Sequence, residues 1–304
     1  ISITCIISIA NLFLIDISAK NIFGNNIARI SNWIYLACPY TIFYALSGGL
    51  TMYLVLGTTV TTYLITSSTV FRKDGLGLSY LQTHFFLFLT IIYVSLLRPT
   101  GSVFGLIIIA LFNVLCFLKI KSGIIKVLRK DKYIGLTFLI LSILFCSTQL
   151  FEYVPYLSFS LASFSNESGS FYGLEREILR NRLSSNEFDF LNIKGNLYFI
   201  FWKISDFVGG ISDIRDTHRD LTVKPLFPFL IRVLTGIFYI YPVNLFSIAG
   251  ILTYRKRILD SGFFIILIAS IIVISPSIIG VAFSRYLIMV YPPFIICCSS
   301  IISL

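Results

Sequence analysis

The stretch LSYLQTHFFLFLTIIYVSLL-RPTG-SVFGLIIIALFNVLCFL, residues 78–118, consists of two apolar runs joined by a turn at 98–101. Each run is close to the roughly 20 apolar residues that an α-helix needs to cross a bilayer. The bilayer core offers no water to exposed backbone groups, so a crossing segment must satisfy them internally, as a helix does. The stretch therefore predicts two membrane-spanning helices with a tight turn between them.

The composition extends this prediction to the whole chain of 304 residues. Hydrophobic residues make up 57% and charged residues 12%, whereas soluble domains carry ~25% charged residues. We therefore expect an all-α, polytopic transmembrane protein rather than a soluble domain with an anchor. The net charge of +10 lies in short connections between apolar runs, which indicates membrane topology and not nucleic-acid binding.

About nine apolar segments are expected to cross the membrane. They are residues 1–15, 33–46, 50–71, 78–97, 102–118, 133–151, 226–252, 262–282 and 286–304. Residues 33–71 could instead form one long kinked helix, but that length is nearly twice a single crossing. The chain then divides into N-terminal helices (1–151), a polar segment (152–225) and C-terminal helices (226–304).

Four short connections are basic, and the span count places all of them on one side of the membrane. They are residues 16–32, 72–77, 119–132 and 254–260. The positive-inside rule makes that side cytoplasmic. The turns at Ser47, Arg98 and Arg285 and the long polar segment then lie on the extracytoplasmic side of the plasma (inner) membrane.

The long polar segment, Glu152 to Lys224, holds ten of the fourteen acidic residues. Within it, residues 171–183 have the periodicity of an interfacial amphipathic helix. Residues 196–208 are apolar and aromatic but too short to span. Residues 213–220, DIRDTHRD, pack three acids, two arginines and His218 into one turn. The segment is the main polar surface of the chain, although DIRDTHRD also fits a simple solvated turn.

Arg98 and Arg285 are the only charges in their short outer turns, against the positive-inside trend. A charge at the membrane boundary often marks a functional site. The alternative is an arginine that extends to bind lipid headgroups. The six cysteines all fall in apolar runs without CxxC spacing, so neither a disulfide framework nor a metal site is expected.

The sequence lacks GxSxG, Walker, HExxH and strand-linked GxGxxG motifs, which argues against the common soluble-enzyme mechanisms. The chemistry that fits is transfer of a group carried on a lipid phosphate at the membrane surface. The leaving phosphate needs Arg, Lys or a divalent cation, and the acceptor hydroxyl needs a base. The candidate bases are Glu175, Asp213, Asp216 and His218. The candidate phosphate or substrate ligands are Arg98, Arg285, Tyr286, Arg176, Arg180, Arg182 and Arg215.

Four short motifs, taken in order, resemble those of the C-type glycosyltransferases. The proline–aromatic–Ser turn of that family is similar to residues 38–47, and its RPT turn to residues 97–100. Residues 224–242 resemble the span that follows its outer loop. Residues 284–294, SRYLIMVYPPF, resemble the closing span of its dolichyl- and undecaprenyl-phosphate-sugar transferases. The motifs are distributed over most of the chain.

The resemblance implies inverting transfer of a sugar from a polyprenyl-phosphate donor to a glycan acceptor outside the cytoplasm, with Arg98 and Arg285 holding the lipid phosphate. The family's acidic motif in its first outer loop has no counterpart before Pro39, so the catalytic acid is expected either upstream of Ile1 or at another position of this chain. That departure favours the O-antigen polymerases, which use undecaprenyl-diphosphate sugars and a large arginine-rich outer loop. Both interpretations predict a membrane glycosyltransferase for surface polysaccharide synthesis.

The alternative to an enzyme is a lipid-linked oligosaccharide flippase or another polytopic transporter. Such proteins carry ionisable residues within their spans. The predicted spans place no charge near a span centre, since His84 and Glu152 fall near span ends. A purely structural subunit of a membrane complex is a further alternative.

Overall fold

The computed structural model describes residues 2–47, 50–72, 77–122, 127–162, 234–279 and 291–303. The chain divides into two compact units. The first comprises Ile1–Leu150, Pro242–Val273 and Leu287–Leu304, and the second comprises Phe151–Tyr241 and Ile274–Tyr286. The first unit contains most of the residues that the structure describes.

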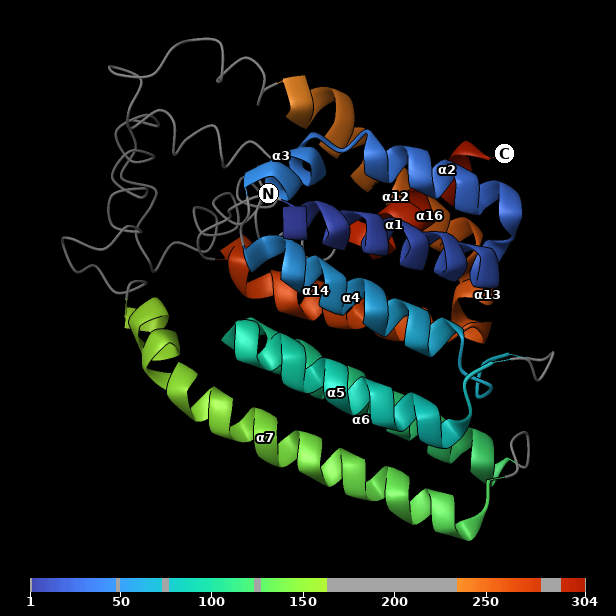
Figure 1. The fold of residues 1–304 in the computed structure, drawn as a ribbon, viewed down its shortest axis with the longest axis vertical. Helices are drawn as coiled ribbons and strands as arrows, with labels where there is room; N and C mark the ends of the chain where they lie inside the picture. The colour runs from blue at the N-terminus through green and yellow to red at the C-terminus, as the bar shows by residue number, and fades with distance from the viewer. Residues whose placement is uncertain are drawn as a thin grey trace, which may run out of the picture. The chain divides into compact units, whose positions relative to one another are not determined.

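Helices are the regular elements of the described residues, with one isolated bridge between Ser68 and Leu78. In order they are α1 (Ser2–Phe23), α2 (Asn25–Leu36), α3 (Pro39–Ser47), α4 (Leu50–Thr66), α5 (Tyr80–Leu97), α6 (Pro99–Lys121), α7 (Arg129–Ala162), the π-helical turn η1 (Gly236–Ile240), α12 (Tyr241–Thr253), α13 (Arg255–Asp260), α14 (Phe264–Ile279) and α16 (Tyr291–Ile302). The expected all-α class is confirmed for this part of the chain (Figure 1).

Five helical segments are long and apolar enough to cross a membrane. They are Ile3–Phe23, Tyr80–Leu97, Gly101–Lys121, Lys130–Gln149 and Gly236–Thr253. Shorter apolar helices cover Leu50–Thr66, Phe263–Val273 and Tyr291–Ile302. These segments overlap eight of the nine predicted spans, but only five meet the length of a full crossing. The hairpin predicted from residues 78–118 is present as α5 and α6.

The first span is longer than predicted, and the connection expected at 16–32 is helical. Helix α1 continues through Asp16 and Lys20 to Phe23, because buried Ile15, Ala19 and Ile22 keep an apolar face there. The turn comes at Gly24, whose φ of 106° is strained for residues with a side chain. Helix α2 then returns along α1 with an amphipathic pattern.

The second predicted span, 33–46, is interrupted at Cys38. Helix α2 ends at Leu36, and α3 starts at Pro39. Proline disfavours the helical conformation in the residue before it and supplies no backbone N–H, so it serves well as a first helical residue. Trp33 is 73% exposed near the end of α2. Two short helices therefore replace the single expected crossing.

Helix α4 is the core of the first unit, because it contacts α1, α3, α5 and α16. Twelve of its residues are buried, and several of these are threonines. Their hydroxyls donate to carbonyls one turn earlier, as Thr61 does to Gly57 at 2.7 Å and Thr62 to Thr58 at 2.7 Å. These bonds satisfy hydroxyl groups that lie in an apolar surrounding.

Small residues bring the central helices close together. A β-carbon at Gly57 of α4 would overlap the Val94 side chain of α5, and one at Gly105 of α6 would lie 2.7 Å from Ile91. In membranes, helix association depends on such close packing, because the lipid is as apolar as the side chains. These glycines therefore allow the close approach of α4, α5 and α6.

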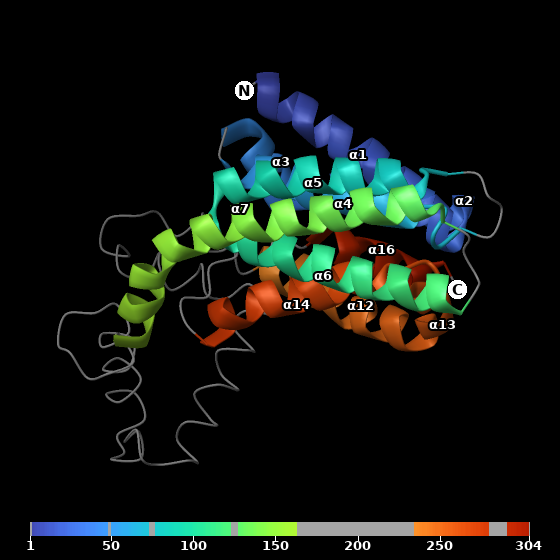
Figure 2. The same cartoon turned by 90° about the horizontal axis from the view of Figure 1, so that it is seen from below.

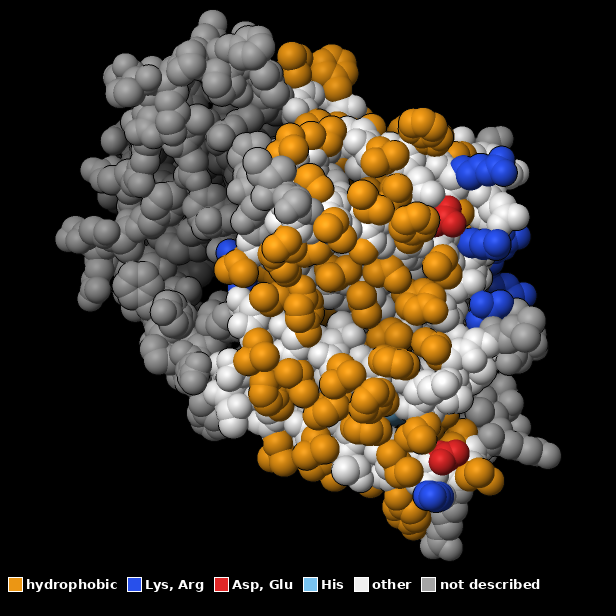
Figure 3. Space-filling view, viewed as in Figure 1, with side chains coloured by type: hydrophobic (Ala, Val, Ile, Leu, Met, Phe, Trp, Pro, Cys, Tyr) orange, Lys and Arg blue, Asp and Glu red, His pale blue; other side chains and the backbone are white. Residues whose placement is uncertain are grey.

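The connections of the first unit lie at two opposite ends of its helices (Figures 1 and 2). One end, which we call the basic end, holds the corner at Gly24 and the connections α4–α5, α6–α7 and α12–α14. Lys and Arg side chains gather there, and apolar side chains cover the face shown in Figure 3. All four predicted basic segments therefore contribute to one end of the unit.

Cross-contacts at the basic end join these connections. The Asn21 amide donates to the Ser67 hydroxyl at 2.9 Å. The Lys119 ammonium donates to the Val70 carbonyl at 2.8 Å and lies 4.3 Å from the Phe71 ring centroid. At the other end, which we call the Arg98 end, α5 turns into α6.

We expect cysteines at Lys121 and Lys256 to react with a membrane-impermeant maleimide from one side, and a cysteine at Arg98 from the other. The reason is that the helices place the first two residues at the basic end and the third at the opposite end. The measurement uses right-side-out and inverted vesicles carrying each variant in a chain whose six cysteines are replaced by alanine. Labelling of Lys121→Cys and Lys256→Cys from opposite sides would contradict this fold.

Gly57→Ala should lower the stability of the protein by about 1–3 kcal/mol, because the new methyl group has no space beside Val94. Val94→Ala in the same chain should recover most of that loss, giving strong non-additivity. Thermal unfolding in detergent measures both effects. The control is Val60→Ala on the same helix, which should combine additively with Gly57→Ala. Additive losses for Gly57→Ala and Val94→Ala would rule out the contact.

Candidate functional site

Arg98 stands at the corner between α5 and α6, where two helices meet without a loop. Arg98 is both the C-cap residue of α5 and the N-cap residue of α6, and its backbone is extended (φ −160°, ψ 148°). Its N–H donates to the Val94 carbonyl at 3.2 Å, and its carbonyl accepts from Gly101 at 2.8 Å. Pro99 begins α6 at the position where its missing N–H costs nothing.

The corner is sterically fixed around Arg98. A β-carbon at Gly101 would overlap the backbone carbonyl of Val94, so only glycine fits this approach. The side chain of Arg98 is half-buried. A guanidinium held on a rigid corner at a helix boundary is well suited to binding a planar or tetrahedral anion.

Arg98 is distinguished by its position among the described charges. Among the residues with described side chains, the other charged groups lie at the basic end or within α1 and α2 near it. They are Asp16, Lys20, Arg29, Arg72, Lys119, Lys121, Lys130, Asp131, Lys132, Arg255, Lys256, Arg257 and Asp260. Helix α7 starts at the basic end.

The other predicted site residues lie outside the residues that the structure describes. They are Glu175, Asp213, Asp216, His218, Arg176, Arg180, Arg182, Arg215, Arg285 and Tyr286. Their proposed roles therefore remain predictions. The described part of the predicted site is the Arg98 corner.

An acid within the first span was missed by the sequence analysis. Asp16 lies inside the candidate span Ile3–Phe23, and its carboxylate accepts from the Asn32 amide of α2 at 2.8 Å. The predicted end of the span at residue 15 had placed Asp16 in a connection. The regular apolar spacing of Ile15, Ala19 and Ile22 was the signal that could have located it. The statement that no charge lies well inside a span is therefore wrong for this helix.

His84 is fully buried near the start of α5. Its Nδ1 lies 2.9 Å from the Tyr80 carbonyl oxygen, and its Nε2 lies 3.1 Å from Oδ1 of Asn113 on α6. The ring also packs against Phe112 with centroids 5.0 Å apart. These contacts give His84 a structural role at the α5–α6 interface.

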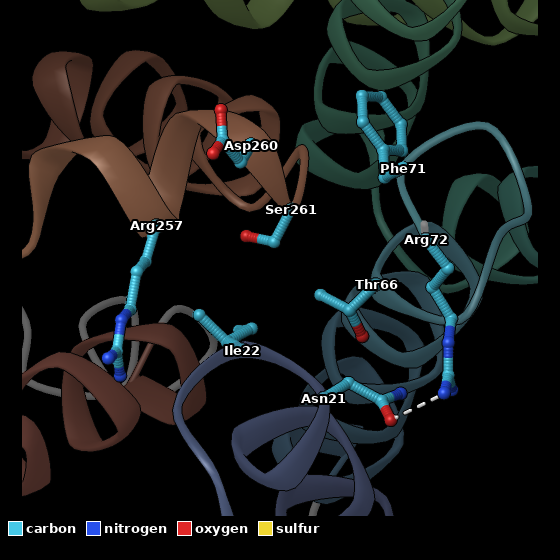
Figure 4. Close-up of a pocket in the computed structure, with 8 residues that line it drawn as sticks. All are labelled: Asn21, Ile22, Thr66, Phe71, Arg72, Arg257, Asp260 and Ser261. Carbon is cyan, nitrogen blue, oxygen red and sulfur yellow. Dashed lines mark hydrogen bonds between the residues drawn. The ribbon is translucent and has the colours of Figure 1, made fainter. Parts of the chain in front are cut away.

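The basic end contains a pocket of about 370 Å³. Its lining residues come from α1, α4, the α4–α5 connection and the α13 region: Asn21, Ile22, Thr66, Phe71, Arg72, Arg257, Asp260 and Ser261. Figure 4 shows Arg72 and Arg257 on opposite sides of the cavity. The sequence analysis had interpreted the basic residues at this end only as a topology signal and had predicted no binding site among them.

Within the described residues, no group of three or more His, Cys, Asp or Glu side chains could hold a metal ion. All six cysteines are free, and five of them are buried. Most of the charged side chains described in this part of the chain are lysines and arginines, and arginine in particular suits binding of anions.

No protein-family model, curated protein or solved structure matches this chain. The described residues define a structural class: a helical protein with several helices long and apolar enough to span a membrane. Its function is therefore inferred from the residues themselves.

Asp16→Ala should destabilise the protein, because the side-chain amide of Asn32 loses the carboxylate that accepts its hydrogen bond. In a double-mutant cycle with Asn32→Ala we expect a coupling of about 0.6 kcal/mol, the average measured for hydrogen bonds between membrane helices, and at most about 1.7 kcal/mol. Thermal unfolding in detergent or nanodiscs gives the coupling. Ser31→Ala is the control, because Ser31 bonds to Ser299 instead. A coupling near zero would show that the pair does not form.

Proposed function

We propose that this protein is an integral-membrane glycosyltransferase that transfers or polymerises sugars from a polyprenyl-phosphate- or diphosphate-linked donor. The observation that carries the proposal is the placement of Arg98. It is a guanidinium on a rigid helix corner, at the opposite end from the basic residues of the first unit. In our proposal this corner lies at the depth of a lipid-linked phosphate, between the apolar tail and water.

The reaction explains why a cation is needed at such a corner. The acceptor hydroxyl attacks the anomeric carbon of the donor sugar, and its proton passes to a carboxylate or histidine base. The bond from that carbon to the phosphate oxygen breaks, and the electron pair stays on the phosphate. A pre-positioned guanidinium stabilises the negative charge as it develops. Arg98 supplies that group in our proposal.

The polar segment 152–225 supplies most of the remaining residues of the proposed mechanism. We assign the base to Glu175, Asp213, Asp216 or His218, and further phosphate contacts to Arg285, Tyr286 and the arginines at 176, 180, 182 and 215. A divalent cation could share the charge of a diphosphate leaving group. The segment faces the outside of the plasma membrane in this proposal, and the glycan acceptor approaches from there.

The supporting sequence observation is the order of the short motifs that resemble C-type glycosyltransferases and O-antigen polymerases. The motif around Arg98 lies within the described residues: Pro99 starts α6, and Gly101 allows the close turn. The cluster of basic connections at the other end supports a cytoplasmic position for that end. Together these features favour transfer at the extracytoplasmic surface.

A second candidate, a lipid-linked oligosaccharide flippase or another transporter, is favoured by one observation. Asp16 lies within a candidate span and is hydrogen-bonded to a polar side chain on a neighbouring helix. Acids in such positions are common in proton-coupled transporters. Loss of transport on Asp16→Asn with unchanged glycan transfer would separate the two functions.

Arg98→Ala should weaken binding of undecaprenyl phosphate to the protein in nanodiscs by about ten-fold or more, the effect of losing one charge-assisted contact. Arg98→Lys should retain part of the affinity, because it keeps the charge but loses the guanidinium geometry. Native mass spectrometry of the nanodiscs measures both variants. Formation of polysaccharide by cells carrying each variant should fall in the same order.

The control for Arg98 is Lys121→Ala, which removes one positive charge at the basic end. It should leave both readouts unchanged. Thermal unfolding checks that Arg98→Ala remains folded. Wild-type affinity and wild-type polysaccharide in a folded Arg98→Ala variant would reject this role.

A further inference from the structure

The pocket at the basic end lies entirely within the first unit and is separate from the Arg98 corner. Buried Ile22, Thr66 and Phe71 line its inner wall, and the outer residues are polar. Its volume of about 370 Å³ falls in the range of small-molecule sites, ~300–1,000 Å³. The cavity is therefore large enough for a ligand that extends beyond a single anion.

A neutral side chain, Asn21, orients Arg72. The Arg72 guanidinium donates to Oδ1 of Asn21 at 3.1 Å, and Asn21 in turn donates to Ser67 at 2.9 Å (Figure 4). This chain of hydrogen bonds fixes the guanidinium at the pocket edge. The Asn21 contact uses one of the five N–H donors of a guanidinium.

Arg257 faces the pocket from the short helix α13. Its guanidinium carbon lies 5.7 Å from the Tyr254 ring centroid, within cation–π distance. The Tyr254 ring packs edge-on against Phe23 of α1, with centroids 5.5 Å apart. The second arginine is thus supported by contacts with the same helix that supplies Asn21.

The remaining polar groups determine which ligand the pocket favours. Thr66 and Ser261 already donate their hydroxyl hydrogens to carbonyls of Thr62 and Ile258, at 2.8 and 3.2 Å. They therefore offer acceptors, and the strong donors of the pocket are the arginines. Asp260 is the single carboxylate among the lining residues, which also include two arginines.

These features disfavour two ligand classes. A cation would be repelled by the two guanidinium groups. An apolar ligand would displace water from the guanidinium groups and leave their N–H groups without hydrogen-bond acceptors. A phosphate group complements them, because its oxygens accept several N–H donors at once. Basic pockets between helices of membrane proteins bind anionic headgroups for the same reason.

We propose that this pocket binds a phosphate monoester, with Arg72 and Arg257 donating to its oxygens from two sides. The group could belong to a lipid headgroup such as phosphatidic acid or to a soluble phosphorylated compound. This site is independent of the donor phosphate proposed at Arg98 and is at the opposite end of the helices.

The test titrates the chain of 304 residues in phosphatidylcholine nanodiscs with dioctanoyl phosphatidic acid and, separately, with glycerol 3-phosphate. Dioctanoyl phosphatidylcholine is the negative ligand. Arg257→Gln and Arg72→Gln should each weaken binding by about ten-fold or more. Asp260→Asn should strengthen it, because it removes the opposing charge. Arg257 is exposed, so its variant remains informative if loss of the Asn21 bond impairs folding of the Arg72 variant.

Arg255→Gln is the matched control: it removes the same charge from α13, but Arg255 does not line the pocket. It should change affinity by less than about two-fold, because salt screens exposed charges. Binding of phosphatidic acid alone would identify a lipid headgroup, and binding of both ligands a soluble phosphate compound. Binding of neither, or equal loss in Arg255→Gln and Arg257→Gln, would overturn the proposal.

Discussion

The structure depends on one constraint: polar groups within the apolar helices must find partners inside the protein. Helix α4 shows this most clearly, because it is buried and rich in threonine. Threonine hydroxyls of α4 donate hydrogen bonds to carbonyls of the same helix, and the Thr59 hydroxyl also donates to Oδ1 of Asn11 on α1 at 2.6 Å. Lipid tails are as apolar as the helices, so the hydrophobic effect does not drive the helices together. Hydrogen bonds between polar side chains therefore help to join them. The close glycine contacts then set the distances between α4, α5 and α6.

Much of the helical organisation could be predicted from the sequence, since long apolar runs have few alternatives. The α5–α6 pair follows directly from residues 78–118, and the tight corner at Arg98 was visible in the RPTG turn. Pro39 was placed inside the predicted span 33–46, whereas α2 and α3 are separate helices on either side of Cys38. Capping of α5 by Ser79 and Gln82 also agrees with the predicted start near residue 78.

The errors come from reading charge as an end of a span. Asp16 and Lys20 are polar in the sequence, yet one is hydrogen-bonded to α2 and the other is exposed close to the helix end. A local pattern cannot show that Asn32 lies opposite Asp16. The pocket at the basic end was unpredictable for the same reason: Asn21, Arg72 and Arg257 are far apart in the chain and meet only through packing. The positive-inside rule already explained the basic residues, so the sequence analysis did not consider that Arg72 and Arg257 could also line a pocket.

The corner at Gly24 has a consequence for how the protein enters the bilayer. Asp16 and Asn32 are sixteen residues apart in the chain, on opposite sides of that corner. If α1 and α2 leave the translocation machinery together as a preformed pair, the carboxylate carries its hydrogen-bond donor with it. Asp16 then enters the hydrocarbon already hydrogen-bonded to Asn32. This happens before α4 or any later helix has been synthesised. Biogenesis of this polar span would in this way require no residue beyond Leu36.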